Sequence, residues 1–184
     1  GAGGWAEYAV SDYRRTLPVP DHMDFIQGGT ISSAFLTMHD AIVTNGEFKS
    51  GQSILIQGGS TGVGIMGMQF GKHLGASLVI GTSTNAERRG RLTEFGADLA
   101  LDSSDPGWVD QVLEATDGKG VDLIIDQISG YAANQNMAAT KVHGRIINVG
   151  RLGGEVAEFD FNMHAERRLT YIGTTGRTRS LEEH

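Results

Sequence analysis

Residues 57–67 read QGGSTGVGIMG and directly follow the apolar run SILI at residues 53–56. Five glycines among eleven residues would weaken an ordinary helix or strand, because glycine loses more backbone freedom on folding than any other residue. Glycines gathered after a short apolar run are instead typical of a tight turn that leaves a strand. The following segment, residues 62–74, has a helical pattern and ends before Gly75, a favoured helix C-cap residue. The stretch therefore predicts a strand, a glycine-rich turn and a helix in succession.

Three known patterns fit the glycine-rich turn. Gly59 and Gly64 approximate the dinucleotide-binding pattern G-x-G-x-x-G, with Thr61 at the position of the second glycine. The spacing from Gly58 to Gly64 also matches the G-x-x-x-G-x-G pattern of short-chain dehydrogenases. Ser60 has a glycine two residues before it and two residues after it, which gives G-x-S-x-G, the nucleophile elbow of α/β-hydrolases. The turn alone does not choose among these three chemistries.

Short apolar runs alternate with helical patterns along the rest of the chain. The runs cover residues 53–57, 78–81, 99–101, 121–126, 145–149 and 169–173. The helical patterns cover residues 62–74, 85–95, 105–116 and 132–140, the third with Asp105 as its N-cap and Pro106 at its first position. Because several runs are apolar throughout, we expect strands that are buried on both faces, as in a parallel sheet. This alternation predicts a doubly wound α/β fold.

The first 50 residues do not follow this alternation. Residues 6–10 have the composition of a strand, and residues 17–25 (LPVPDHMDF) form a connector that contains two prolines. Residues 31–43 have a helical pattern. We expect this segment to be the end of another module that precedes the sheet.

Composition and charge exclude several classes of function. The 184 residues carry a net charge of −7, with 15 basic and 22 acidic side chains, so they offer no basic surplus for a nucleic-acid partner. The chain has no cysteine, which excludes disulfides and thiolate metal sites and fits a reducing compartment. Its six histidines lack the close spacing of metal ligands, and no apolar run reaches the length of about 18 residues that a membrane span needs. We therefore expect a cytoplasmic protein with no metal, nucleic-acid or membrane partner.

The end of the second apolar run indicates which dinucleotide the turn would bind. NAD-binding sites commonly carry an acidic residue there for the ribose 2′-hydroxyl, but residues 57–86 contain no Asp or Glu. The run is followed instead by Ser83 and Thr84, with Arg88 and Arg89 in the next helical pattern. Hydroxyl and guanidinium groups suit a phosphate, because arginine can donate two parallel hydrogen bonds to its oxygens. These residues favour NADPH over NADH, although such clusters also occur as helix caps and solvated helix faces.

The two other interpretations of the turn have less support. Short-chain dehydrogenases require Tyr-x-x-x-Lys, and none of the four tyrosines has a lysine four residues later. A hydrolase that uses Ser60 could take Asp126 and then His143 or His164 in the required order. Most of a hydrolase sheet precedes its elbow, however, whereas the residues before this turn are helical and rich in turns. The hydrolase therefore stays an alternative that we do not favour.

The segment ILIQGGSTGVGIMGMQFGKHLGASLVIGTSTNAERRGRLTEFGADLALD, residues 54–102, resembles the cofactor domain of medium-chain dehydrogenases/reductases. The resemblance is to the zinc-free quinone oxidoreductase branch, of which zeta-crystallin is an example. Further similarities are GGWAEYAV at residues 3–10, VDLIIDQISG at residues 121–130 and GRIINVGRLGG at residues 144–154. The family implies a Rossmann-type sheet of six parallel strands and hydride transfer from NADPH to an activated carbonyl or alkene.

The resemblance also assigns roles to individual residues. It places Thr61, Gly62, Val63 and Gly64 at the pyrophosphate, Ser83, Thr84 and Arg88 at the 2′-phosphate, and Thr37, Val149, Gly150, Arg151 and Thr174 near the nicotinamide and its ribose. Three departures from the family pattern are Thr61 and Thr84, each at a position that is commonly glycine, and Asp102-Ser103, where Asn-Tyr is frequent. The sequence identifies no proton donor.

The resemblance further divides the chain and implies a partner. Residues 1–25 correspond to a remnant of a GroES-like substrate domain with its connector, and residues 26–184 correspond to the NADP-binding domain. Because the returning segment of the substrate domain is absent, we expect a truncated protein with weak activity or none. The implied substrates are quinones, enones and enoyl compounds, and a non-catalytic NADPH-binding module is the alternative. The family also implies a homodimer in which the edge strand Leu169–Gly173 pairs with its own copy.

Overall fold

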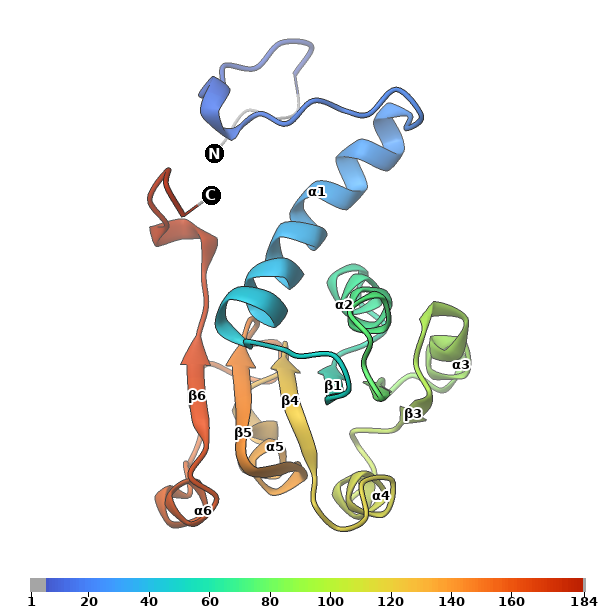
Figure 1. The fold of residues 1–184 in the computed structure, drawn as a ribbon, viewed down its shortest axis with the longest axis vertical. Helices are drawn as coiled ribbons and strands as arrows, with labels where there is room; N and C mark the ends of the chain where they lie inside the picture. Colours follow the sequence, from blue (N-terminus) through green and yellow to red (C-terminus); the bar gives the residue numbers. More distant parts are fainter. Residues whose placement is uncertain (1–5, 184) are drawn as a thin grey trace.

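The computed structural model describes residues 6–183, which form a six-stranded sheet with helices packed against both faces (Figure 1). The strands are β1 Ser53–Gln57, β2 Leu78–Thr82, β3 Leu99–Leu101, β4 Val121–Asp126, β5 Thr140–Asn148 and β6 Thr170–Gly173. The α-helices are α1 Phe25–His39, α2 Gly62–His73, α3 Ala86–Gly90, α4 Trp108–Glu114, α5 Ala133–Ala139 and α6 Phe161–Glu166. A π-helical segment, Asp40–Asn45, continues α1 toward the sheet.

All six strands are parallel and lie in the order β3-β2-β1-β4-β5-β6. Ile54 of β1 is paired with Val79 of β2 on one side and with Leu123 of β4 on the other. The strand order therefore reverses between β1 and β4, which divides the sheet into two halves of three strands. Figure 1 shows the arrowheads of β4, β5 and β6 pointing in one direction. This topology confirms the predicted Rossmann-type, doubly wound sheet of six parallel strands.

Apolar strand residues are buried on both faces of the sheet. All five residues of β1 are buried, and its successive side chains enter two separate cores. Ile54 belongs to the core that contains Met68 of α2. Leu55 belongs to the opposite core, with Trp108 of α4 and Met137 of α5. This two-sided burial is what the uninterrupted apolar runs predicted.

The helix predicted at residues 85–95 is interrupted. The structure has α3 at its start and a short 3₁₀-helix, Leu92–Phe95, at its end. Arg91 separates them with φ −98° and ψ −3°, outside continuous α-helical geometry. Gly90 precedes this break, and glycine disfavours helix by about 1 kcal/mol relative to alanine. Gly96 follows the 3₁₀-helix with φ 96°, the left-handed conformation that commonly ends a helix.

The start predicted for the helix at residues 105–116 is wrong. The helix α4 begins at Trp108, and its N-cap is Gly107, which contributes no side-chain hydrogen bond. The Asp105 carboxylate accepts the Gly107 N–H at 2.9 Å within a turn, so it does not cap the helix. Pro106 therefore lies in that turn and not in the first helical position.

The predicted helix at residues 132–140 and the predicted strand at residues 145–149 need a similar correction. The helix α5 ends at Ala139, and β5 begins with the next residue, Thr140. The prediction missed the first residues of β5 because Lys141 and His143 interrupt the apolar pattern there. Thr140 nevertheless pairs with the first residue of β4, and the register shifts before the paired segment resumes.

The strand predicted at residues 6–10 is also wrong. These residues are exposed and irregular, and within residues 6–183 no strand lies beside them to pair with their backbone groups. The helix predicted at residues 31–43 starts earlier, because Asp24 and Gln27 form a capping box at the beginning of α1.

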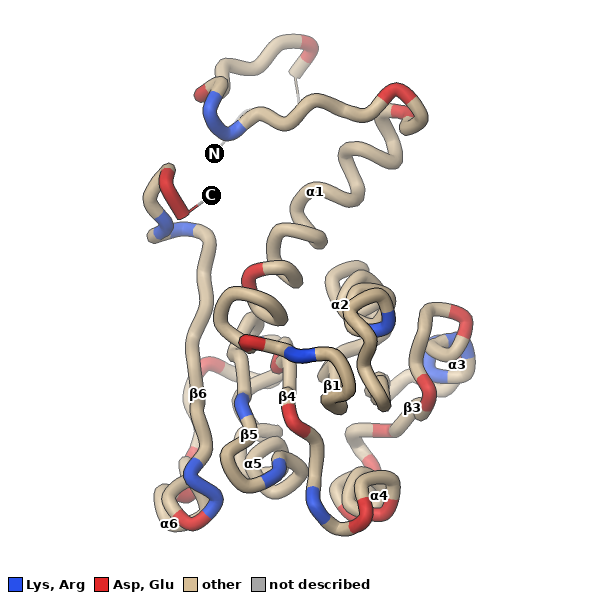
Figure 2. The backbone as a smooth tube through the Cα atoms, in the orientation of Figure 1, with Lys and Arg blue, Asp and Glu red and all other residues tan. Residues whose placement is uncertain are grey.

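The helix α1 projects away from the sheet (Figure 1) and carries no Lys, Arg, Asp or Glu along its length (Figure 2). Met38 is its one buried residue, whereas Phe25 and Ile26 at its start are exposed. Over residues 6–183, none of the helices combines the length and the apolar character that crossing a bilayer requires. The domain boundary at residue 25 and the cytoplasmic location stay predictions.

Candidate functional site

Buried polar residues end four of the six strands at the same edge of the sheet. They are Gln57 of β1, Thr82 of β2, Asp126 of β4 and Asn148 of β5, and each is at most 9% exposed. The carboxyl edge of a parallel sheet, where the strand order reverses, is the usual position of a ligand site in open α/β folds. The candidate site therefore consists of the loops that leave this edge.

The glycine-rich turn between β1 and α2 is packed too closely for side chains at two positions. A Cβ on Gly59 would lie 3.2 Å from the Gly81 Cα, and a Cβ on Gly64 would overlap the Gly58 carbonyl oxygen. Gly58 itself has φ 74°, a left-handed conformation that favours glycine. Gly62 differs, because no atom lies within 4 Å of the position of its Cβ. The turn is thus compact against the sheet and open at Gly62.

The open side of the turn carries free backbone donors. Within the described residues 6–183, the N–H groups of Gly62 and Val63 have no acceptor. They lie in the first turn of α2, which is 12 residues long, so they add to the positive end of the helix dipole. Such an N-terminus favours a phosphate group. The arrangement fits the pyrophosphate of a dinucleotide.

Thr61 caps α2 with its side chain. Its Oγ1 accepts the Gly64 N–H at 2.9 Å and lies 3.0 Å from the Gly58 carbonyl oxygen and 2.9 Å from Gln127 Oε1. The hydroxyl is therefore already engaged on the inner side of the turn. The structure places Thr61 as a residue that shapes the turn, while the free donors for an anion are backbone N–H groups of Gly62 and Val63.

Ser83, at the end of β2, lies directly beside the glycine-rich turn. Its hydroxyl is 2.9 Å from the Ser60 hydroxyl, and Ser83 is only 6% exposed. Arg89 donates to the Ser83 carbonyl oxygen at 2.9 Å and forms an ion pair with Asp102 at 2.9 Å. Hydrogen bonds from Ser104, with Arg89 nearby, hold the pKa of Asp102 below its ordinary value. Arg89 is therefore fixed by an ionised partner.

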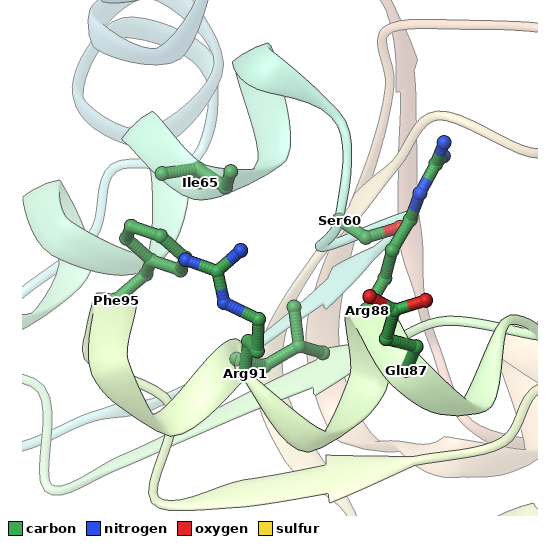
Figure 3. Close-up of a pocket in the computed structure, with 7 residues that line it drawn as sticks. Ser60, Ile65, Glu87, Arg88, Arg91 and Phe95 are labelled. Carbon is green, nitrogen blue, oxygen red and sulfur yellow. The ribbon is translucent and has the colours of Figure 1, made fainter.

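Arg88 has a different position from Arg89. It lines a cavity of about 190 Å³ beside Ser60, as Figure 3 shows. The cavity is lined by Ser60, Ile65, Glu87, Arg88, Arg91, Leu92 and Phe95. Among the described residues, no acceptor is bound to the Arg88 guanidinium, whereas Arg91 Nε donates to Glu94 at 3.1 Å. Thr84 is exposed and does not line this cavity.

A second cleft opens at the other half of the sheet edge, with a volume of about 860 Å³. It brings together four of the residues that the sequence assigned to the nicotinamide half, namely Thr37 of α1, Val149 and Arg151 after β5, and Thr174 after β6. The Thr174 hydroxyl donates to the Asn148 carbonyl oxygen at 3.2 Å. The Thr37 hydroxyl donates within its own helix, to Ser33, at 2.8 Å.

Gly150, the fifth of these residues, packs inward and does not line the cleft. A Cβ at this position would lie 2.6 Å from the Gln127 carbonyl oxygen. The Ser129 hydroxyl donates to the Gly150 carbonyl oxygen at 2.7 Å, and Asn148 Nδ2 donates to both groups. Gly150 thus holds the loop after β5 close to the loop after β4.

Asp126 lies beneath these loops and does not face either cavity. Its carboxylate accepts the Ile128 N–H at 2.9 Å and the Ser129 N–H at 2.8 Å, and the Tyr171 hydroxyl lies 3.4 Å away. Burial raises the pKa of Asp126 above its ordinary value, although these hydrogen bonds oppose the shift. Burial, with the Asp126 charge, raises the pKa of Tyr171 to about 12. The contacts of Asp126 are therefore structural.

The geometry does not support a hydrolase. The Ser60 hydroxyl is bonded to Ser83, and no histidine among residues 6–183 forms a hydrogen bond to it. His143 is exposed, and His164 packs on Phe159 with ring centroids 5.5 Å apart. In the same described part of the chain, no three His, Cys, Asp or Glu side chains form a group that could hold a metal ion.

Sequence reasoning missed a buried amide network under the turn. Gln57 Oε1 accepts the Thr82 hydroxyl at 2.7 Å, and Gln57 Nε2 donates to Asn136 at 2.8 Å. Gln127 bonds to the backbone of the turn from the other side. The sequence does carry a signal for this network, because Gln57 and Gln127 are polar residues at the ends of two apolar runs.

Comparison with known proteins agrees with this geometry. The profile of the zinc-binding dehydrogenase family matches residues 62–183. The chain belongs to this family. Human quinone oxidoreductase is 28% identical over 152 residues, which are 83% of this chain and 46% of that protein. The chain therefore spans about half the length of the curated relatives that it matches.

Solved structures of similar proteins give the same result for the zinc-binding dehydrogenase fold. The mycobacterial protein Rv1454c, solved in complex with NADPH, has a TM-score of 0.81 and 27% identity over 90% of this chain and 52% of that chain. A domain described as a putative enoyl reductase of a polyketide synthase has a TM-score of 0.68 and 25% identity over 78% of each chain. These relatives confirm a quinone oxidoreductase-like cofactor domain of the medium-chain dehydrogenase/reductase type.

Proposed function

We propose that the chain binds NADPH along the carboxyl edge of its sheet and is the cofactor-binding part of an oxidoreductase. The observation that carries the proposal is the cavity beside the glycine-rich turn, where Arg88 has a free guanidinium and no acidic residue ends β2. A zinc-binding dehydrogenase profile supports an enzyme, so the non-catalytic binding module is not favoured. The complex of Rv1454c with NADPH supports a nicotinamide cofactor.

The adenosine half of NADPH would lie over β1 and β2. The N–H groups of Gly62 and Val63 would hold the pyrophosphate, which can approach because nothing covers Gly62. Arg88 would bind the 2′-phosphate, with the Ser83 and Ser60 hydroxyls at the base of the same site. This part of the proposal predicts a preference for NADPH over NADH.

The nicotinamide half would lie in the larger cleft, beside Thr37, Val149, Arg151 and Thr174. Bound NADPH supplies a hydride to the substrate. The residues of this chain would orient the ring, because the loops on which they stand are fixed by Asp126 and its hydrogen-bond partners. Gly150, which the resemblance placed near the nicotinamide, would act by letting the loop after β5 lie close to the loop after β4.

The proposed substrates are activated carbonyls and alkenes such as quinones, enones and enoyl compounds. Support comes from relatives that are described as a quinone oxidoreductase and as an enoyl reductase domain. The proposal includes a reaction without zinc, as in the branch that the sequence resembles, and this chain has no cysteine to offer as a ligand. Catalysis requires the substrate to be held in a water-excluding site. The chain spans only about half the length of its curated relatives, so we expect the 184 residues alone to reduce substrates slowly.

Titration of the two cofactors tests the proposal. NADPH should bind more tightly than NADH, and Arg88→Ala should weaken NADPH by about 10-fold or more, since a hydrogen bond to a charged group contributes about 1.5–3 kcal/mol. The same substitution should leave NADH affinity unchanged. Lys49→Ala, at an exposed position outside both cavities, is the matched control. Equal affinity for both cofactors in the unmodified chain would overturn the NADPH assignment.

We also propose that the chain forms a homodimer through β6. This strand is at the edge of the sheet and pairs only with β5 within residues 6–183. Its residues Thr170, Tyr171 and Ile172 are half-buried, so one side of an apolar strand is available to a copy. An exposed strand edge offers unpaired N–H and C=O groups to another strand.

A further inference from the structure

Gln127 is a buried residue directly after β4, and among the described residues its side-chain amide bonds only to the glycine-rich turn and to Gln57 beside it. It is 5% exposed. Its Nε2 donates to the Gln57 carbonyl oxygen at 3.0 Å and lies 3.3 Å from the Gly58 carbonyl oxygen. Its Oε1 accepts the Thr61 hydroxyl at 2.9 Å. The amide thus uses both its donor and its acceptor on the turn that faces the pyrophosphate.

The backbone of Gln127 contacts the opposite half of the site. Its carbonyl oxygen accepts the Leu152 N–H at 3.2 Å. A Cβ on Gly150 would lie 2.6 Å from that oxygen and 3.1 Å from the Gln127 Cα, so the loop after β5 rests on this residue. Val149 and Arg151 of the same loop line the larger cleft.

Two neighbouring hydroxyls of the network each reach one of the two halves. The Ser129 hydroxyl bonds to Gly150 and Asn148, which belong to the side of the larger cleft. The Thr61 hydroxyl bonds to Gly58 and Gly64 of the turn and otherwise only to Gln127. Ile128, the next residue, also touches both loops, because its side chain packs beside Gly58 and its carbonyl oxygen accepts the Gly153 N–H at 2.7 Å. Gln127 differs from Ile128 in that its side chain holds the turn by hydrogen bonds while its backbone supports the loop after β5.

We propose that Gln127 is a positioning residue that holds the glycine-rich turn and the loop after β5 in a fixed relation, so that both halves of one NADPH molecule fit at once. The inference rests on the proposed NADPH site and adds to it a residue that touches neither the phosphates nor the nicotinamide. A side-chain amide suits this role because it can donate to carbonyl oxygens and accept from a hydroxyl at the same time.

Half-ligands separate this role from direct binding. We suggest 2′,5′-ADP for the adenosine half and reduced nicotinamide mononucleotide for the nicotinamide half, each titrated by calorimetry. Gln127→Met keeps the approximate volume and removes the hydrogen bonds. It should weaken NADPH by about five-fold, which corresponds to ~1 kcal/mol at 25 °C, whereas each half-ligand needs only one loop and should bind as in the parent. Ser129→Ala is the matched control and should weaken only the nicotinamide half. A Gln127→Met variant that binds NADPH as tightly as the parent, or that weakens a half-ligand as strongly as NADPH, would overturn the inference.

A pH profile guards against a general folding defect. Gln127→Glu has the same shape, and its protonated carboxyl can still donate to one of the carbonyl oxygens on the turn, whereas its carboxylate is repelled by both. The NADP⁺ affinity of this variant, divided by that of the parent at each pH, should therefore recover as the pH falls. The ratio removes the pH effects that the two proteins share, and the remaining change belongs to the pair that Glu at position 127 forms with Asp126, the adjacent buried carboxyl. A ratio that stays constant with pH contradicts the positioning role.

The two proposals fail in different ways. If the parent chain binds neither NADPH nor 2′,5′-ADP, the proposed function fails and the inference fails with it. If the parent binds NADPH and Gln127→Met binds NADPH as tightly as the parent does, the NADPH site stands and only the role of Gln127 is refuted.

Discussion

Adding one methyl group to Gly62 or to Gly64 should have opposite effects on stability, although both glycines lie in the first turn of α2. At Gly64 the new Cβ would overlap the Gly58 carbonyl oxygen and lie 2.8 Å from the Gly59 Cα. Both neighbours are backbone atoms of the same turn, so no flexible side chain can move away. Overpacking of this kind costs about 1–3 kcal/mol, and the better helix propensity of alanine offsets at most about 1 kcal/mol of it.

At Gly62 the added methyl group meets no atom within 4 Å. Gly62→Ala should therefore be as stable as the parent or up to about 1 kcal/mol more stable. The two variants should then differ by about 2 kcal/mol in free energy of unfolding, measured by urea denaturation with far-UV circular dichroism. The same Gly62 methyl group would occupy the approach of the pyrophosphate, so NADPH affinity should fall in the more stable variant.

Two results would refute this reasoning. Equal unfolding free energies for Gly62→Ala and Gly64→Ala would show that the turn is not packed against itself as described. A Gly62→Ala chain that binds NADPH as tightly as the parent would show that the pyrophosphate does not approach the open side of the turn.

Three further predictions concern the core, the buried tyrosine and the sheet edge. Trp108→Ala should destabilise the chain by about 3–5 kcal/mol in urea unfolding, because the side chain is fully buried in the core of α4 and α5. A loss below about 1 kcal/mol would contradict that packing. The folded state favours the neutral Tyr171 phenol, because the pKa of this group rises from 10.0 to about 12 on folding. The stability that this group contributes should therefore be complete below pH 10.0 and be lost as the pH rises to about 12. Thermal unfolding measured across this pH range should show a smaller loss of stability for Tyr171→Phe than for the parent. Sedimentation at micromolar concentration should show a dimer that Thr170→Pro converts to a monomer, because proline removes a backbone donor of β6; a monomeric parent chain would rule out the dimer.

The sequence predicted the sheet well because buried parallel strands leave a local signal. The run VDLIID became β4 with five of its six residues buried, and the order of strands and helices along the chain allowed only a few topologies. Helix ends were harder. Asp105 and Pro106 have the right chemistry for a helix start, but the carboxylate formed a local turn instead, which no pattern of residue types distinguishes.

The candidate site was predictable where its chemistry is local and not where it depends on distant partners. The glycine-rich turn and Arg88 could be found from residue type and spacing. The choice between Arg88 and Arg89 depends on Asp102, which lies on another strand end. The network of Gln57 and Gln127 joins residues 70 positions apart, so its pairing follows only from the folded sheet.

The central position of β1 has a consequence for the order in which the molecule can assemble. Its neighbour β2 begins about 25 residues later, but its other neighbour is far along the chain, as the bond between Ser53 and Asp122 across 69 positions shows. During synthesis, residues 53–101 can form the three-stranded half β1-β2-β3 while the other edge of β1 stays without a partner. That edge is apolar on both sides and remains exposed to other chains until β4 has emerged, which makes this interval the one most open to aggregation. A ribosome pause before β4 has left the exit tunnel would lengthen the interval, whereas a later pause would not.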